Sequence, residues 1–514
     1  MELPRIFVSI ASYRDSEGPA TVTDLFARAA HPERVFAGVL WQVIPGDDDD
    51  CIGGEAPASH VRSLTVHASE SLGACWARHR ILTELRRDED YVLQIDSHMR
   101  FEPGWDEAFI AMLQRCPSPR PVLSSYPVPY QLPDRLGERR IPVQIAKQFS
   151  DQGGLLLHSR ALPYECRPQA PLPSAFVGAG CIFAPAAAFD EVPYDPLLYF
   201  QGEEITLAVR LWTHGWDLFT PDDVLLYHDY SNERGRPRHW SDNRDWATLS
   251  ARAHARLRCL LARELPADPE AMRDIARYGL GTRRTLEEYE RFADLDFRRR
   301  TIGLRAADGR FGSPLDDGEV RRARAFSRIF NERTWGCVET RSGPGSTLAA
   351  TAAMRKSLLK LLQRLNVRSL LDAGCGDLNW FGPALDTLDL YLGIDVSPEV
   401  IDYVLGLHRG RRGVFFNVAD VVSDALPSAD AVLCRHVLTH LPNAQVQAAL
   451  ENIRRSGARY LIATSHRGAA NAEVEPGGWR AQDLCAPPFS LPPPAFVLQD
   501  GGGTELRVWD LTAG

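Results

Sequence analysis

An aspartate and a histidine stand two residues apart where an apolar run of the sequence ends. The stretch is YVLQIDSHMRFEPGW, residues 91–105, and the pair is Asp96 and His98. Alternate residues of a strand point to the same face, so these two side chains can reach one ion while Ser97 points away. The carboxyl ends of strands are where α/β sheets place their ligands. The pair therefore predicts a divalent metal site, although the triplet alone would also suit a surface turn capped by the aspartate.

A second set of polar residues follows about 130 residues later. The segment YFQGEEITLAVRLWTHGWDLFTPDDVLLYHDY, residues 199–230, contains the acidic pair Glu203 and Glu204 at the start of an expected helix, and an expected strand that ends at His228. Carboxylates at a helix start are also favoured by the helix dipole alone, so the acidic pair has a structural as well as a functional interpretation.

Together these segments resemble nucleotide-sugar glycosyltransferases of the GT-A type. More narrowly, IFVSIASYRD, LQIDSHMRFEPGWD, FVGAGCIFAPAAAF and YGLGTRRTLEEYERFADLDF are similar to the polypeptide α-N-acetylglucosaminyltransferase family over about the first 300 residues. The resemblance implies that Asp96, His98 and His228 hold Mn²⁺ or Mg²⁺. It also implies UDP-GlcNAc as the donor and a hydroxyl of a peptide or protein as the acceptor.

The same resemblance implies further roles in the first 300 residues. Arg78 would line the donor cleft, although an exposed helical arginine fits the sequence equally well. One of Glu203 and Glu204 would contact the acceptor. A retaining reaction by front-face attack needs no carboxylate nucleophile, because the departing diphosphate can take the acceptor proton. The residues expected to border the uridine, at the end of the first strand, are Ser9, Ala11, Ser12, Tyr13 and Arg14.

The C-terminal part of the sequence contains a different glycine-rich turn. SLLDAGCGD places Asp372, Gly374 and Gly376 between an expected strand and helix, where glycines let the backbone approach a ligand closely. Asn379 stands where a dinucleotide G-x-G-x-x-G pattern requires glycine, which disfavours NAD. The stretch resembles motif I of class I S-adenosylmethionine methyltransferases.

Two further strand ends support that resemblance. Asp395 ends YLGIDVS, in position for the ribose hydroxyls of S-adenosylmethionine, and Asp420 ends FFNVAD, near the adenine. An O-methylation benefits from a base, because the acceptor hydroxyl must lose its proton as the methyl group arrives. We expect His436, just past a strand end, to be that base, and His440 to pack structurally.

The elements that must position these residues form two α/β blocks. In the first, short β-rich runs such as RIFVSIAS and VFAGVLWQV alternate with helical patterns such as TVTDLFARAA. In the second, VRSLLDAGCGD and LYLGIDVS alternate with helices such as AAMRKSLLKLLQRL. We predict a GT-A, Rossmann-like glycosyltransferase domain with a helical C-terminal extension at 1–307, and a class I Rossmann-like methyltransferase domain at 308–514.

Composition narrows the classes of protein. The 514 residues carry a formal charge of -9 and a pI near 5.9, which disfavours a general affinity for nucleic acid or anionic membranes. The ten cysteines form no CxxC pair, and we found no secretory signal or membrane-spanning stretch. We therefore expect a cytoplasmic protein with no nucleic-acid or membrane partner. The sequence does not predict the oligomeric state.

The leading hypothesis is a bifunctional enzyme that adds an N-acetylhexosamine, GlcNAc by the resemblance, to a hydroxyl of a peptide or protein and then O-methylates the product. We expect the methyl group on a hydroxyl of the added sugar. Fusion favours this order, because a tethered second site meets the first product at a raised effective concentration. Three alternatives remain. The methyltransferase could act on the peptide or on an unrelated metabolite; the acceptor of the sugar could be a polysaccharide or small natural product; and one block could have lost catalysis and serve as a binding module.

Overall fold

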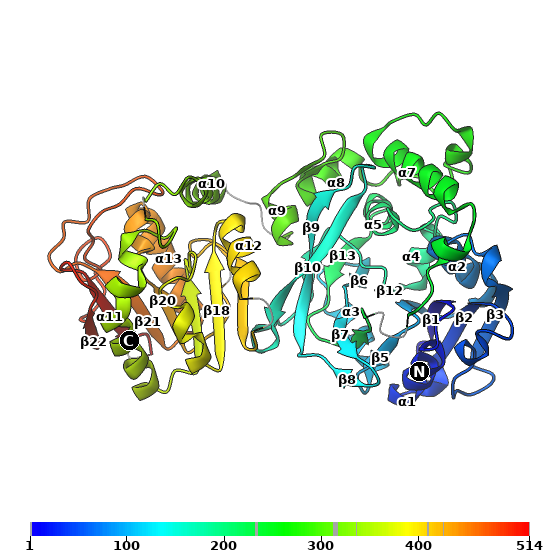
Figure 1. Ribbon diagram of the computed structural model, residues 1–514, viewed down its shortest axis with the longest axis horizontal. Helices are drawn as coiled ribbons and strands as arrows, with labels where there is room; N and C mark the ends of the chain where they lie inside the picture. The colour runs from blue at the N-terminus through cyan, green and yellow to red at the C-terminus, as the bar shows by residue number, and fades with distance from the viewer. Residues whose placement is uncertain are drawn as a thin grey trace. The chain divides into compact units, whose positions relative to one another are not determined.

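The computed structural model describes residues 3–231, 235–311, 317–335, 337–408, 411–424 and 426–512. The chain forms two compact units, Met1–Ser313 and Pro314–Gly514 (Figure 1). The expected boundary segment, RAADGRFGSPLDDG, lies partly outside the described residues; its first part forms helix α9 (Leu304–Asp308). The assignment of glycosyl transfer to residues 1–307 and of methyl transfer to residues 308–514 stays a prediction.

The first unit is built on a mixed sheet of eight strands in the order β11-β13-β6-β12-β4-β1-β2-β3. Strands β3, β2, β1 and β4 are parallel, and β12 is antiparallel to β4. Because β1 and β4 run together, their carboxyl ends meet at one edge, where Ala11 pairs with Asp96. The strands are β1 (Ile6–Tyr13), β2 (Val35–Val43), β3 (Val61–His67), β4 (Tyr91–Asp96), β6 (Pro121–Ser124), β11 (Leu172–Ser174), β12 (Cys181–Pro185) and β13 (Asp217–Thr220).

Both faces of this sheet are buried, as the continuous apolar runs require. Ile6, Val8 and Ile10 of β1 pack in one cluster with α1 (Gly18–Arg28) and α3 (Trp105–Gln114). Phe7 points to the opposite face and packs with α2 (Ala74–Arg80), α4 (Ala186–Glu191) and α5 (Glu203–Thr213). Alternate residues of β1 thus face opposite cores.

Smaller elements complete the first unit. A four-stranded sheet, in the order β5-β14-β7-β8, carries His228 at the end of β14. Its strands are β5 (Met99–Phe101), β7 (Val128–Gln131), β8 (Arg135–Leu136) and β14 (Leu226–His228). The remaining elements are β9 (Arg140–Phe149), β10 (Leu155–Pro163), α6 (His239–Asp242), α7 (Trp246–Ala262), α8 (Leu286–Ala293), β15 (Leu295–Asp296) and β16 (Thr301–Ile302).

The second unit contains a seven-stranded sheet in the order β19-β18-β17-β20-β21-β23-β22. The first five strands are parallel, and β23 is antiparallel to β21. From β17 the chain builds the sheet outward in one direction through β18 and β19, and from β20 it continues on the other side of β17. Open α/β sheets bind ligands at such a change of direction, here between β17 and β20. The elements are α10 (Asp317–Glu332), α11 (Leu348–Arg364), β17 (Ser369–Ala373), β18 (Leu390–Asp395), α12 (Pro398–Leu407), β19 (Val414–Val418), β20 (Ala431–Cys434), α13 (Asn443–Arg455), β21 (Tyr460–Ser465), β22 (Phe496–Gln499) and β23 (Glu505–Asp510).

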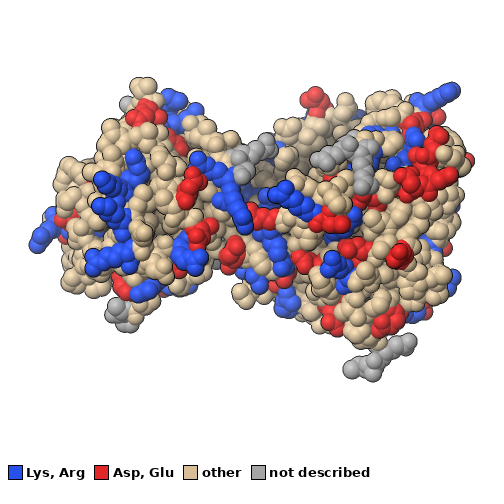
Figure 2. Space-filling view, turned by 60° about the horizontal axis from the view of Figure 1, so that its bottom comes forward, with Lys and Arg blue, Asp and Glu red and all other residues tan. Residues whose placement is uncertain are grey.

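Two further findings concern the helices and the charged surface. Among the described residues, no helix combines the length and the apolar composition needed to cross a membrane. The face in Figure 2 carries acidic and basic side chains interspersed, with only local groups of one sign.

Candidate functional site

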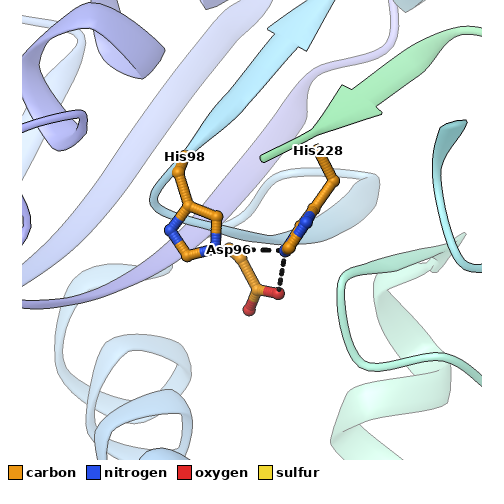
Figure 3. A group of neighbouring side chains, drawn as sticks. All are labelled: Asp96, His98 and His228. Carbon is orange, nitrogen blue, oxygen red and sulfur yellow. Dashed lines mark hydrogen bonds and ion pairs between the residues drawn. The ribbon is translucent and has the colours of Figure 1, made fainter. Parts of the chain in front are cut away.

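The structure brings Asp96, His98 and His228 together at the edge of the main sheet of the first unit. Asp96 is the last residue of β4, and His98 precedes β5. Strand β14 pairs with β5 so that His228 lies opposite Met99. The Nε2 atom of His228 is 3.1 Å from Asp96 Oδ2 and 3.1 Å from His98 Nε2 (Figure 3). One potential ligand atom from each residue lies within 4.8 Å of the others.

Asp15 orients this cluster from behind. Its Oδ2 atom is 2.7 Å from Nδ1 of His98 and 2.6 Å from the hydroxyl of Ser97. Burial raises the pKa of Asp15, but the contacts with His98 and Ser97 outweigh it and lower the pKa to about 2. A carboxylate in this place holds the proton of His98 on Nδ1, which leaves the Nε2 lone pair facing Asp96 and His228.

The donor set suits a divalent ion, because it combines two imidazole nitrogens and one carboxylate oxygen. Burial raises the pKa of Asp96, but the hydrogen bond with His228 and the charge of Arg78 outweigh it and hold the pKa well below its ordinary value. Burial also lowers the pKa of His228, which favours the neutral ring. Ionised carboxylate and neutral imidazole are the forms that bind metals.

Arg78 joins the cluster to the acidic pair at the start of α5. Its guanidinium donates to Asp96 Oδ1 at 2.7 Å and also to Glu203. Arg78 and Glu203 are both buried. Arg78 therefore lies beneath the cluster as a bridge between two carboxylates.

Glu204 points to a different set of partners. The hydroxyl of Tyr126 donates to its Oε2 at 2.5 Å, and the backbone N–H of Ala179 donates to its Oε1 at 2.9 Å. Burial raises the pKa of Glu204 to about 7, against the opposing effect of these two bonds. The neighbouring residue Gly180 is close to the cluster: a Cβ there would lie 3.1 Å from Asp96 Oδ2.

The residues expected to border the uridine divide into two groups. Ser9 and Ser12 are buried within β1, and Ala11 lies beside Asp96. Tyr13 and Arg14 are partly exposed at the strand end and share a partner, Asp242 of α6, at 2.8 and 3.0 Å. Arg14 also donates to Asp48 at 2.7 Å.

The second unit contains a cavity of about 440 Å³ at the reversal of strand order. Five residues predicted from sequence line it: Gly374, Gly376, Asp395, Asp420 and His436. Aromatic residues supply much of the remaining lining, namely Phe326, Phe330, Trp335, Trp380 and Trp479.

The glycine turn and Asp395 form one side of this cavity. Asp395 accepts backbone hydrogen bonds from Gly376 at 3.3 Å and Ser397 at 3.0 Å. Burial raises the pKa of Asp395 to about 6, partly offset by these bonds. Gly376 has a φ of 56°, and a Cβ there would lie 2.3 Å from Ser342 Oγ. A side chain at this position would collide with the segment 339–347, which lies over the turn.

Asp372 and Asp420 already have protein partners. Asp372 is buried in β17 and accepts from the hydroxyl of Tyr391 at 2.7 Å; burial raises its pKa to about 7. Asp420 lies at the cavity wall, where Arg322 of α10 donates to its Oδ2 at 2.8 Å. Contact of either carboxylate with a cofactor stays a prediction.

His436 follows β20 in a left-handed conformation, with a φ of 55°. Its Nε2 lies 3.4 Å from Oδ2 of Asp500, which also accepts two hydrogen bonds from Arg435, both at 2.9 Å. His440 is buried, stacks on Trp335 and contacts the carbonyl of Gly478 through Nδ1 at 2.6 Å. Burial lowers the pKa of His440 to about 4, which suits a neutral packing residue.

Sequence reasoning did not identify three residues that belong to these arrangements. Asp15 directly follows the strand-end segment SYR, so its position was a usable signal. Tyr126 and Asp500 carried none, because each reaches its partner from far along the chain: Tyr126 is 78 residues from Glu204, and Asp500 is 65 residues from Arg435.

Comparison with known proteins matches two parts of the chain to two different family models. The family model for Glycosyltransferase (GlcNAc) matches residues 5–58 and 55–299, and the chain belongs to that family. The model for a Methyltransferase domain matches residues 371–458. The α/β fold-class prediction is thus confirmed for both units, the second with the strand order described above. A search of curated proteins found no match.

Solved structures of both kinds are similar to parts of the chain. GalNAc-T7 with UDP, GalNAc and Mn²⁺ has 15% identity over 57% of this chain and 55% of its own, with a TM-score of 0.36. The methyltransferase domain of bacterial CtHen1 has 18% identity over 23% of this chain and 66% of its own, with a TM-score of 0.21. Magnesium protoporphyrin IX methyltransferase from Synechocystis PCC 6803, with bound SAM, has 17% identity over 32% of this chain and 83% of its own, with a TM-score of 0.26.

Proposed function

We propose that the first unit transfers N-acetylglucosamine from UDP-GlcNAc to a hydroxyl of a peptide or protein, and that the second unit O-methylates the added sugar with S-adenosylmethionine. The observation that carries the first half is the convergence of Asp96, His98 and His228, oriented by Asp15, in a chain of the GlcNAc glycosyltransferase family. The methyltransferase family match and the glycine-turn cavity support the second half.

In the first unit, Asp96, His98 and His228 would hold Mn²⁺ or Mg²⁺. Such an ion, when bound, neutralises the diphosphate of the donor. Arg78 keeps Asp96 ionised and fixed in position through the 2.7 Å bond. Tyr13 and Arg14 lie at the end of β1 and would border the uridine, with Ser9, Ala11 and Ser12 shaping the strand behind them.

One member of the acidic pair would act on the acceptor, and neither would be a nucleophile. Glu203 is engaged by Arg78, whereas Glu204 has Tyr126 and the Ala179 N–H as partners. We assign acceptor orientation to Glu204 and support of Arg78 to Glu203. A retaining reaction then proceeds by front-face attack, in which the acceptor hydroxyl gives its proton to the departing diphosphate.

In the second unit, Asp395 would bind the ribose hydroxyls, and the Gly374–Gly376 turn would let the backbone approach the cofactor. Asp420 would lie near the adenine, held by Arg322. Asp372 would support the turn from within β17. His436, which lines the cavity, would accept the proton of the acceptor hydroxyl.

Mass spectrometry of peptides incubated with the full chain tests this function. Peptides with serine, threonine or hydroxyproline are supplied with a panel of UDP-sugars, with Mn²⁺ or EDTA, and with or without S-adenosylmethionine. We expect addition of one N-acetylhexosamine from UDP-GlcNAc with Mn²⁺ only, and a further methyl group only with S-adenosylmethionine. Transfer to oligosaccharides or small molecules but to no peptide would contradict the proposed acceptor.

A further inference from the structure

His436 lines the cavity of the second unit and has a buried aspartate, Asp500, beside it. Asp500 stands in the turn between β22 and β23, and its carboxylate is fully buried. Arg435 fixes both oxygens of Asp500 and also donates to the carbonyl of Gly345 at 2.8 Å. Burial raises the pKa of Asp500, but His436 and Arg435 outweigh it and lower the pKa. Asp500 therefore presents an ionised carboxylate to Nε2 of His436.

This contact determines what His436 can do. A carboxylate 3.4 Å from Nε2 favours the tautomer that carries the proton on that atom, which leaves the lone pair of the neutral ring on Nδ1. Among the described residues, none forms a hydrogen bond with Nδ1 of His436. The side chain is 28% exposed and lines the cavity. Asp500 thus holds the ring at Nε2, and Nδ1 is available to accept a proton from a molecule in the cavity.

Trp479 gives the same cavity an apolar face open to water. It lines the cavity yet is 62% exposed, against 45% for Trp246, the other large exposed tryptophan among the described residues. Its nearest ring neighbour is His466, with the ring centroids 6.0 Å apart and the planes at 90°. An indole this exposed presents an apolar face to solvent. Such a face can pack against the C–H face of a sugar ring, while the ring hydroxyls stay in water or reach polar groups.

The turn that carries Asp500 has three consecutive residues without side chains. His466 Nε2 lies 3.4 Å from the hydroxyl of Thr504, and Gly501, Gly502 and Gly503 connect Thr504 to Asp500. All three glycines have positive φ, and a Cβ on any of them would meet no atom within 4 Å. No side chain of these three residues would therefore obstruct an acceptor larger than a free monosaccharide.

We infer that this side of the cavity is the acceptor subsite for a sugar ring carried on a peptide, with Trp479 as the platform for the ring and Asp500 as the positioning residue for His436. The inference rests on the proposed methyl transfer and adds its substrate class and two residues.

The sugar, S-adenosylmethionine and His436 account for every atom and electron pair of the methyl transfer. The sugar hydroxyl gives its proton to Nδ1 of His436 while its oxygen forms a bond to the methyl carbon of S-adenosylmethionine. The bond between that carbon and the sulfonium sulfur breaks, and its electron pair stays on sulfur. The products are the methyl ether, neutral S-adenosylhomocysteine and one proton on His436, which passes to water.

The platform is tested with synthetic peptides that already carry GlcNAc on serine, threonine or hydroxyproline, so that the first unit is not needed. We expect Trp479→Ala to raise KM for the glycopeptide about three- to tenfold with little change in kcat, and Trp479→Phe to restore most of the loss. Trp246→Ala, in the other unit, is the matched control and should change neither constant. An unchanged KM in Trp479→Ala, or free GlcNAc methylated as efficiently as the glycopeptide, would overturn the subsite.

The positioning role is tested by the separate effects of a substitution on kcat and on KM of methyl transfer. The titratable or charged groups around His436 are Asp500, Arg435, His440 and His466. Burial lowers the pKa of both neighbouring histidines, so they are neutral near pH 7. Asp500 is the one carboxylate among these groups, and Asp500→Asn should lower kcat about tenfold or more with KM for the glycopeptide and binding of S-adenosylmethionine little changed, because the imidazole loses the carboxylate that orients it.

A second variant keeps the test decisive if Asp500→Asn folds poorly. His436→Ala should lower kcat about 100-fold, and added imidazole should restore part of it, while calorimetry shows unchanged binding of S-adenosylmethionine. Unchanged rates, or no rescue by imidazole in a variant that still binds the cofactor, would overturn the base and its positioning residue. Failure of the wild type to bind S-adenosylmethionine would instead refute the proposed function itself.

Discussion

The Nδ1 atom of His98 lies 2.7 Å from Oδ2 of Asp15, and that same oxygen accepts the hydroxyl of Ser97 at 2.6 Å. The two contacts fix the imidazole in rotation and in tautomer. They also explain how a loop residue can be as well placed as Asp96, which is held by the sheet. Asp15 itself is anchored, since its Oδ1 accepts the backbone N–H of Glu17 at 3.0 Å.

Replacement of Asp15 by asparagine should weaken Mn²⁺ binding about 10- to 100-fold, the usual cost of losing a carboxylate that orients a ligating histidine. Isothermal titration of the full chain with Mn²⁺ and UDP measures it. Asp88→Asn, at an exposed pair with Arg5, serves as the control and should bind as the wild type does. Equal affinity in Asp15→Asn would show that His98 needs no such partner.

Arg78→Met should destabilise the first unit by about 3–5 kcal/mol, because it leaves the buried carboxylate of Glu203 without its counter-charge. Hydrogen exchange in a urea series, followed on peptides of each unit separately, measures the loss. Arg80→Met on the same helix is the matched control. Its partner Glu84 is exposed, so the expected loss stays below about 1 kcal/mol.

A double variant identifies the cause of that loss. Adding Glu203→Gln to Arg78→Met removes the stranded charge and should recover much of the stability. If Arg78→Met alone costs less than the Arg80→Met control, the bridge between Asp96 and Glu203 is not a stabilising element.

Asp372 should make the stability of the second unit depend on pH. Burial raises its folded-state pKa to about 7 from an ordinary value of 3.8. The folded state therefore binds the proton more tightly than the unfolded state does. The stability from this group is complete below about pH 4 and is lost as the pH rises through about 7.

Asp372→Asn cannot ionise, so its stability relative to the wild type should rise by an amount on the order of a few kcal/mol between pH 4 and pH 8. Hydrogen exchange of β17 amides at several pH values measures it. A difference between the two proteins that stays constant with pH would mean that Asp372 is ionised in the folded state throughout.

Much of this architecture could be predicted from sequence because it rests on local patterns. The apolar runs became β1, β2, β4, β17 and β18, and the pattern AAMRKSLLKLLQRL became part of α11. Strand alternation brought Asp96 and His98 to one face, and the resemblance supplied His228, which the pairing of β14 with β5 places beside them.

The rest depends on contacts between distant segments. No local pattern indicates that Arg78 bridges Asp96 and Glu203, which are 18 and 125 residues away. Nor does one indicate that Asp500, in a hairpin turn, lies against His436. Which distant residues become partners depends on the order in which the strands pair, so these contacts can be identified only in the folded structure.

The last prediction concerns Asp395, whose carboxylate ends β18 at the cavity wall. If it accepts the ribose hydroxyls, Asp395→Asn should weaken binding of S-adenosylmethionine about 10- to 100-fold, the cost of losing hydrogen bonds to a charged acceptor. Burial raises its pKa to about 6, so wild-type affinity should fall as the pH drops below that value, whereas the affinity of Asp395→Asn should not. Calorimetry from pH 5 to pH 8 measures both, with Asp389→Asn at an exposed pair with Arg368 as the control. Parallel pH curves for wild type and Asp395→Asn would place the ribose elsewhere, because only a titrating acceptor at this position can make the two diverge.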